Sequence, residues 1–365
     1  MNPALAGHAS EVGDKLVAMR RWLADSEAGA LRLRGSEWFA WATAGGSNTV
    51  LLTAETGVAE VLVTQAEACI LTDEIEADRL RDEEVPPEFS LHAAPWADPD
   101  WREQFVLGAA ETRPVLSDRP QGDELPLPAH ARIRRMVLSE PERERYRVLG
   151  AQAAAAMSET LHAARPNWSG FQLAGAGAQA LWRRGIHPAL VLAAGERRLP
   201  LYRHPTPSEE PLGRHAMLVF CARRHGLYAN LTRCVGFGHV PERQSDLFAV
   251  EATGLAACVA GNSLSAVYHA LEQGYRHAGL PGEIRAHHQG GITGYQAREL
   301  VATANTALAL ENGMAVAFNP SFTGLKVEDT FLLGERGLEN LTLDPAWPAT
   351  CVHGRMRPLW LEARW

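Results

Sequence analysis

The chain has 365 residues, enough for two domains of ordinary size, and 46 % of them are hydrophobic, which is ample for a large core. Its formal net charge is −8, from 35 basic and 43 acidic residues. This balance argues against a general nucleic-acid-binding protein, because such proteins carry a basic face. No apolar stretch reaches the roughly 18 residues of a membrane span. The first residues lack the apolar segment of a secretory signal, so we expect a cytoplasmic protein.

The N-terminal part alternates helix-like and strand-like segments. Apolar residues at helical spacing predict a helix over 11–25. Short apolar runs between turn residues predict strands over 29–35, 48–54, 58–64 and 68–73. A stretch richer in proline and charge, 114–141, reads as a connection. We therefore predict an α/β domain over residues 1–135 and a second domain over residues 136–365.

The second domain begins with a strong helix-start signal. Ser139 can cap the helix and Glu142 lies three residues later, as in a capping box. Further segments alternate between the two periodicities. The predicted strands are 188–195, 216–222, 313–319 and 330–334, and the predicted helices are 246–261, 263–279 and 297–313.

Four polar stretches in this domain could carry chemistry: 199–216, 217–238, 285–299 and 318–330. His204 lies in a proline-flanked turn, where an imidazole can act as a base or can simply be a surface histidine. Cys221 reads as a nucleophile or as a small buried apolar residue. The five cysteines are scattered without a CxxC pair, which indicates neither a zinc knuckle nor a disulfide framework.

The four stretches, in this order, resemble the pita-bread superfamily, which includes methionine aminopeptidase, aminopeptidase P, prolidase and creatinase. The resemblance covers about residues 139–340. "YANLTR" (228–233) parallels a family motif of the type Y-A-S-D-x-T-R, and "FNPSFTGLKVEDT" (318–330) parallels E-P-G followed by R-x-E-D-T. The resemblance implies an α+β protein, with a small N-terminal α/β creatinase-type domain followed by a C-terminal pita-bread domain.

The family peptidases hold two divalent metal ions on Asp, Asp, His, Glu and Glu. Carried over by motif, these ligands fall near Cys221 and on Asn230, His288, Asn319 and Glu328, so two of the five survive. Two divalent ions about 3.5–4 Å apart need anionic oxygens to offset their repulsion, and neutral amides do not supply them. We therefore expect neither a dinuclear metal site nor another cofactor.

Creatinase is similar in working without the full ligand set. The resemblance implies a metal-independent hydrolase of a small amide, amidine or dipeptide-like C–N bond. It implies a catalytic group of His204, His288 and Glu328, and a substrate-binding group of Asn230, Arg298, Asn319 and Tyr295. Tyr295 is also an alternative occupant of a peptidase histidine position.

Two alternatives to this hydrolase stay open. One is a non-catalytic binding module, like the metal-free pita-bread domains of a histone chaperone and growth-regulating relatives. The other is a metal-dependent Xaa-Pro dipeptidase or aminopeptidase. The expected ligand is a small molecule or a short peptide, and the resemblance implies a homodimer.

Overall fold

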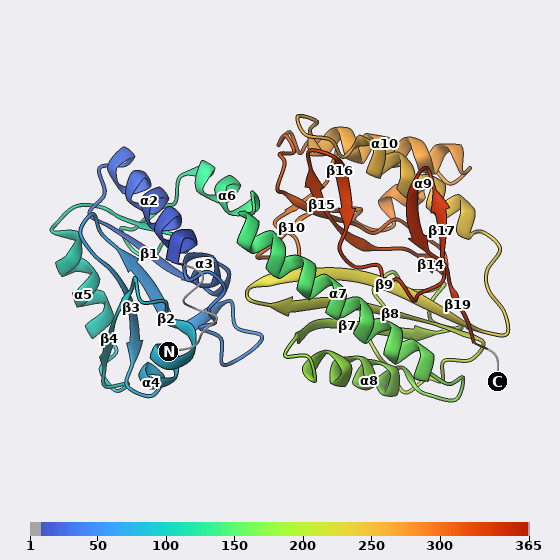
Figure 1. Cartoon of the computed structure of the whole chain (residues 1–365), viewed down its shortest axis with the longest axis horizontal. Helices are drawn as coiled ribbons and strands as arrows, with labels where there is room; N and C mark the ends of the chain where they lie inside the picture. Colours follow the sequence, from blue (N-terminus) through green and yellow to red (C-terminus); the bar gives the residue numbers. More distant parts are fainter. Residues whose placement is uncertain (1–8, 364–365) are drawn as a thin grey trace. The chain divides into compact units, whose positions relative to one another are not determined.

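The protein divides into two compact units, Met1–Arg135 and Met136–Trp365, in a computed structural model that describes residues 9–363. Figure 1 shows the strands and helices of each unit. No helix among residues 9–363 is long and apolar enough to cross a bilayer.

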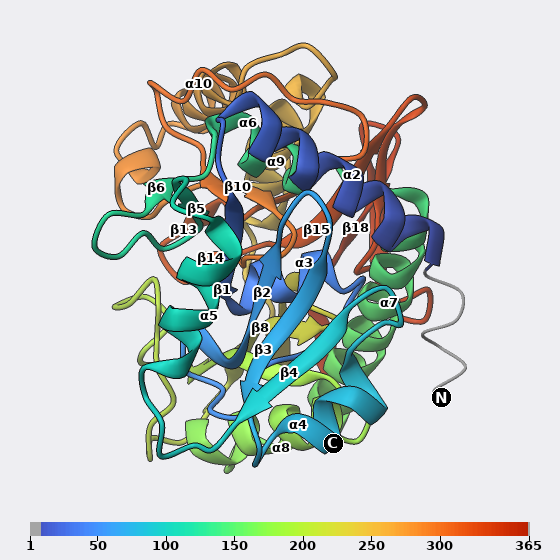
Figure 2. The same cartoon turned by 90° about the vertical axis from the view of Figure 1, so that its left-hand side faces the viewer.

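The first unit is built on one mixed six-stranded sheet with the strand order β4-β3-β2-β1-β5-β6. Figure 2 shows β4, β3 and β2 side by side in this order. The strands are β1 (Ala30–Gly35), β2 (Thr56–Val63), β3 (Ala68–Asp73), β4 (Ser90–Ala94), β5 (Val115–Ser117) and β6 (Leu125–Pro126). The helices are α2 (Ala9–Asp25), α3 (Ser36–Ala42), α4 (Ala77–Arg79), a π-helical turn (Leu80–Glu84), α5 (Trp101–Ala110) and α6 (Ala129–Met136).

Apolar residues from the sheet and from α5 form a core in this unit. Leu62 and Leu71 of the sheet are buried against Val106 and Ala110 of α5. The prediction of a strand over 48–54 is wrong, because this segment forms bends in which Leu51 is 66 % exposed. The neighbouring β2 already pairs with β1 on one side and β3 on the other, which leaves this segment no open edge there.

The second unit contains two larger sheets with helices packed against them. One sheet has the order β19-β9-β8-β7 and the other has the order β11-β10-β12-β15-β16. Figure 1 shows α7 and α8 along the first sheet, and α9 and α10 side by side near the second. The helices are α7 (Glu140–Ala163), α8 (Gly170–Trp182), α9 (Gln244–Ala257), α10 (Leu264–His277) and a 3-10 turn (Glu283–Arg285).

The strands of the second unit also include two short hairpins, β13–β14 and β17–β18. Their bounds are β7 (His187–Gly195), β8 (His215–Arg224), β9 (Leu227–Phe237), β10 (Gly290–Thr293), β11 (Leu300–Val301), β12 (Ala315–Phe318), β13 (Ser321–Phe322), β14 (Leu325–Lys326), β15 (Asp329–Gly334), β16 (Gly337–Asn340), β17 (Ala349–Val352), β18 (Arg355–Pro358) and β19 (Leu361–Ala363).

The predicted start of α7 is confirmed. The Ser139 backbone N–H donates to the Glu142 carboxylate at 2.7 Å, and the reciprocal bond of a capping box is present. This pair satisfies backbone donors that the first turn of a helix leaves open.

The predicted helix over 297–313 is wrong. Leu300 and Val301 instead form β11, which pairs with β10. Beyond it the chain runs as turns and extended backbone, and the amide of Leu264 donates to the carbonyl of Leu308. Alanine and leucine give this segment a helical preference, but strand pairing and backbone bonds to the start of α10 outweigh it.

A buried ion network fixes β15 in place. Asp329 accepts from Arg233 of β9 at 2.6 Å and pairs with Arg357 of β18 at 2.7 Å. Arg357 also donates to Glu251 of α9, and all four side chains are at least 96 % buried. Buried charges are costly unless they are paired, so these ion pairs are not easily broken. They hold Asp329 in place and thereby restrain Glu328, the residue before it.

Candidate active site

Three neighbouring strands end at the same edge of the second sheet. The register pairs Gly290 with Phe318 and Phe318 with Asp329. Asn319 lies one step beyond this row, and its amide donates to the carbonyl of Gln289 at 3.2 Å. His288 and Glu328 flank the same row, so the fold brings three of the predicted site residues to one edge.

Strand β9 of the other sheet meets this edge through Glu328. The Thr232 amide donates to the Glu328 carbonyl at 3.1 Å, and the Thr232 hydroxyl donates to its carboxylate at 2.9 Å. Asn230 lies two residues earlier and therefore on the same strand face. The two sheets thus meet where the "YANLTR" and "VEDT" segments touch.

The Glu328 carboxylate is held by cationic groups of the chain itself. Arg298 donates to Oε1 at 2.6 Å, and the Lys326 ammonium lies 3.8 Å from Oε2. Burial alone would raise the pKa of Glu328, which is 2 % exposed. The attraction of Lys326 and Arg298, together with the bonds from Arg298 and Thr232, outweighs burial and lowers it. Glu328 is therefore a carboxylate at neutral pH.

Lys326 is a site residue that the sequence analysis missed. Its side chain is 5 % exposed, and burial lowers the pKa of its ammonium while Glu328 opposes that shift. The signal was present in the sequence, because residues two apart in an extended segment share a face. Lys326 and Glu328 stand at this spacing.

Two buried asparagines present carbonyl oxygens without partners. Asn230 donates from Nδ2 to the Thr293 hydroxyl at 2.9 Å and to the Ala297 carbonyl at 3.4 Å. Because a carbonyl can only accept, this contact fixes the orientation of the Asn230 amide. The Oδ1 atoms of Asn230 and Asn319 accept no hydrogen bond from residues 9–363, although the two side chains are 0 % and 1 % exposed. Such atoms are costly unless a bound molecule or water donates to them.

Three histidines gather near this edge, and the sequence analysis had chosen only two of them. One ring nitrogen each from His204, His287 and His288 lies within 4.8 Å of the others. His204 Nε2 lies 2.8 Å from His287 Nε2, and the ring centres of His287 and His288 are 4.4 Å apart. His287 is buried, whereas His204 and His288 are exposed.

The surroundings keep all three imidazoles neutral. Burial, followed by the charge of Lys326, lowers the pKa of His287 to about 2. Partial burial of the ring, followed by the charge of Arg298, lowers the pKa of His288 to about 4. Partial burial and Lys326 also lower the pKa of His204, against the opposing effect of Glu328.

The hydrogen bonds assign the tautomers of the two paired rings. His287 Nδ1 contacts the carbonyl oxygen of His288, which can only accept, so this nitrogen carries the proton. The neutral ring of His287 then accepts at Nε2 from the Nε2–H of His204. His204 is left with a lone pair on Nδ1, and Nδ1 has no hydrogen-bond partner in the described part of the chain.

The remaining predicted residues have other contacts. Arg298 donates to the Ala297 carbonyl as well as to Glu328, and its Nε–H has no acceptor among the described residues. The Tyr295 hydroxyl donates to Glu142 at 2.7 Å and is buried. Burial, reinforced by Glu328, raises the pKa of Cys221 to about 12. Cys221 is therefore a neutral thiol, which disfavours a nucleophilic role.

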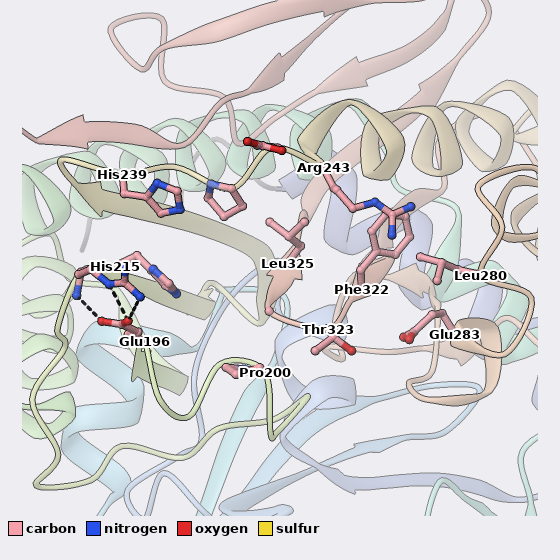
Figure 3. Close-up of a pocket in the computed structure, with 14 residues that line it drawn as sticks. Glu196, Pro200, His215, His239, Arg243, Leu280, Glu283, Phe322, Thr323 and Leu325 are labelled. Atoms are coloured by element: carbon pink, nitrogen blue, oxygen red, sulfur yellow. Dashed lines mark hydrogen bonds and ion pairs between the residues drawn. The ribbon is translucent and has the colours of Figure 1, made fainter.

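A cavity of about 530 Å³ in the second unit is lined in part by the β13–β14 hairpin. Figure 3 shows Leu325 and Phe322 of the β13–β14 hairpin on it, with Arg243 over the Phe322 ring. Glu196 lines another side, where Arg214 binds it. Lys326 directly follows Leu325, so one hairpin contributes to both the cavity and the polar edge. The volume is within the range of small-molecule sites.

The sequence of residues 144–335 matches the profile of metallopeptidase family M24, which spans more than half of the chain. The chain belongs to metallopeptidase family M24. No curated protein matches the sequence of this M24 protein. The predicted resemblance to the pita-bread superfamily is confirmed by the family match.

Solved structures agree with the fold expected for an M24 protein. A Xaa-Pro dipeptidase from Bacillus anthracis has a TM-score of 0.76 at 17 % identity, covering 96 % of this chain and 100 % of that one. The prolidase from Pyrococcus horikoshii OT3 has a TM-score of 0.74 at 15 % identity, covering 91 % and 98 %. The N-terminal domain of FACT complex subunit SPT16 from chickpea has a TM-score of 0.68 at 14 % identity, covering 91 % and 96 %. The predicted fold class is thereby confirmed.

Proposed function

We propose that this M24 protein hydrolyses a small amide, amidine or dipeptide-like C–N bond and that it does so without a metal ion. The position of Glu328 carries the proposal. Its carboxylate accepts from Arg298 at 2.6 Å, and the Lys326 ammonium lies 3.8 Å away. A divalent ion placed at this carboxylate would have to displace one chain cation and withstand the repulsion of the other.

The donor set supports the same conclusion. The positions that correspond to family carboxylates include Asn230 and Asn319, which bring oxygen atoms but no charge. A pair of divalent ions bound there would keep most of its mutual repulsion. The residues present therefore do not fit the dinuclear centre that the family name implies, and no step of the proposed reaction passes through a metal ion.

In the proposed reaction, His204 moves the proton. Its Nδ1 takes a proton from water, and the water oxygen forms a bond to the substrate carbon. The C–N bond then breaks, and the proton passes from His204 to the departing nitrogen. Positioned acid–base groups of this kind contribute about 10²–10⁴-fold to the rate.

The chain cations and amides would hold the reacting group. Lys326 and Arg298 would stabilise the negative charge that develops on the substrate oxygen, a task that metal ions perform in metallopeptidases. The Oδ1 atoms of Asn230 and Asn319 would accept from substrate N–H groups. Glu328 would fix both cations, and the remaining Arg298 donors, including its Nε–H, could bind a substrate carboxylate.

Hydrolysis in the presence of a chelator tests the proposal. Protein purified with EDTA should cleave one compound from a panel of dipeptides, N-acylamino acids and creatine-like amidines. His204→Ala should lose at least about 100-fold in kcat. The matched control His269→Ala changes an exposed histidine on α10 and should keep the rate. Activity that appears only with stoichiometric metal ion would instead support a metal-dependent Xaa-Pro peptidase.

A binding module without catalysis is the second candidate. The unpartnered buried amide oxygens favour it equally, because they call for a bound donor but not for turnover. The fold similarity to the SPT16 domain is compatible with this role. A ligand from the same panel would then raise the Tm of wild type and of His204→Ala alike, with no hydrolysis by either. Light scattering would test the homodimer that the resemblance implies.

A further inference from the structure

We propose that His204, His287 and His288 together bind one transition-metal ion. Only His288 of these three corresponds to one of the family's five ligand positions, so the ligand set is a different one. The ion would close the site to catalysis, because it would bind the imidazole of His204 that moves the proton. The binding clause stands on the histidine geometry alone, whereas the closing clause rests on the proposed hydrolase.

The ring positions carry the first step of this inference. The three nitrogen atoms lie within 4.8 Å of one another, and two of them, on His204 and His287, face each other at 2.8 Å. Two neutral imidazoles facing through these nitrogens need a proton between them, and a metal ion can take the place of that proton. Imidazole nitrogens bind zinc at about 2.0–2.1 Å, so tetrahedral donors stand about 3.3 Å apart. The His204–His287 pair would open by about half an ångström, and His288 would move inward.

The chain already holds the two contributing segments together. His204 lies in the loop between β7 and β8, whereas His287 and His288 lie just before β10. Arg203, next to His204, forms an ion pair with Glu283 of the 3-10 turn that precedes His287. The site is therefore braced by a contact outside it. Because His204 and His288 are exposed, an ion can reach them from solvent.

The charges nearby select the kind of ion. Lys326 acts electrostatically on all three rings, whereas Arg298 and Glu328 act on His204 and His288. Arg298 is already paired with Glu328. Lys326 leaves net positive charge, which weakens the binding of any cation. Ions that bond strongly to imidazole, such as Zn²⁺, Ni²⁺ and Cu²⁺, overcome this more readily than Mn²⁺ or Mg²⁺, which prefer carboxylate oxygens. Three nitrogen ligands also leave a fourth position open.

Zinc titration of the chelator-treated full chain tests the binding clause. Competition with a chromophoric chelator should give one Zn²⁺ per chain, and Mn²⁺ and Mg²⁺ should not compete. His204→Gln, His287→Gln and His288→Gln should each weaken zinc binding by at least about 100-fold, because even outer contacts of a metal site are worth 10–100-fold. His269→Gln is the matched control and should bind zinc as the wild type does. If His287→Gln does not fold, the two exposed positions still decide the matter.

Three results would overturn the binding clause: no zinc bound at one equivalent, two ions per chain, or zinc affinity that survives the substitutions. The closing clause has its own readout. Hydrolysis that persists in EDTA should be abolished when EDTA is removed and one equivalent of Zn²⁺ is added. If no hydrolysis is found at all, the proposed function fails while the zinc titration still decides the site. Hydrolysis that zinc enhances would refute the closing clause alone.

Discussion

Replacing Glu328 by glutamine separates a site held by chain cations from one held by metal ions. The side chain is 2 % exposed and lies 2.6 Å from Arg298 and 3.8 Å from Lys326. Unit charges about 4 Å apart attract by about 4 kcal/mol at an effective dielectric constant near 20, and desolvation offsets part of this. Removing one partner of a buried pair costs about 3–5 kcal/mol, because the other charge stays buried. We expect Glu328→Gln to lower the free energy of unfolding by this amount.

Urea denaturation in EDTA measures this loss, and a second substitution tests its cause. Lys326→Met removes one of the two stranded cations, so the double variant should be less destabilised than Glu328→Gln alone. In thermal scans, the single variant should lose on the order of 10 °C in Tm. Glu335→Gln, at an exposed turn of the β15–β16 hairpin, is the matched control and should stay within about 0.5 kcal/mol of wild type.

A free energy of unfolding for Glu328→Gln equal to that of wild type in EDTA would contradict this prediction. Strong stabilisation of wild type by added Mn²⁺, with none for Glu328→Gln, would contradict it as well. Either result would mean that Glu328 serves to bind an ion and that Arg298 and Lys326 are incidental neighbours.

Three further predictions concern the scaffold. Gly290 has φ +93°, and a Cβ there would lie 2.1 Å from a neighbouring carbonyl oxygen. Gly290→Ala should therefore lower the free energy of unfolding by at least about 3 kcal/mol. Gly175→Ala, in an open helical position, should raise it by about 0.5–1 kcal/mol, and urea melts compare the two variants. Burial raises the pKa of Glu124, but the hydrogen bonds from Arg34 and the backbone of Gln121 and the positive charges nearby lower it by more, so the net shift of the pKa is downward. The stabilising effect of the Glu124 carboxylate is therefore complete above about pH 4.3 and is lost as pH falls through its folded-state pKa. Glu124→Gln should lower the free energy of unfolding by about 1.5–3 kcal/mol at pH 7 and by little near pH 2, as measured in paired urea melts. A difference between variant and wild type that does not change with pH would contradict this. Ser139→Ala should cost about 1 kcal/mol through loss of the α7 cap, and an unchanged urea midpoint would refute it.

Motif order predicted the fold, and strand register explains why the site followed in part. Asn230 lies within β9, whereas Asn319 directly follows β12 and Glu328 directly precedes β15, and a fold places such strand ends reproducibly. Sequence reasoning therefore put these residues near one another without knowing a single distance. Their chemical roles stay predictions, because strand position does not reveal what a side chain binds.

The omissions have physical causes of their own. Lys326 is not among the predicted site residues, and only the fold shows that this lysine, a residue type that is rarely buried, is enclosed there. His287 is not among the predicted site residues, because adjacent residues on a strand would point to opposite faces and only one of two neighbouring histidines could then face the site. The two histidines instead precede β10 in irregular backbone, where that rule does not apply. The prediction of a helix over 297–313 is wrong because the pairing of β11 with β10 outweighs the helical preference of the local sequence.

The buried ion network around Asp329 bears on how this protein depends on the metal ions available in a cell. Arg233, Arg357 and Glu251 hold β15 from three directions with groups that are encoded in the chain. These ion pairs support β15 with charges that the chain itself supplies. Under the proposed function, a cell short of zinc and manganese would still contain an assembled protein that can hydrolyse its substrate.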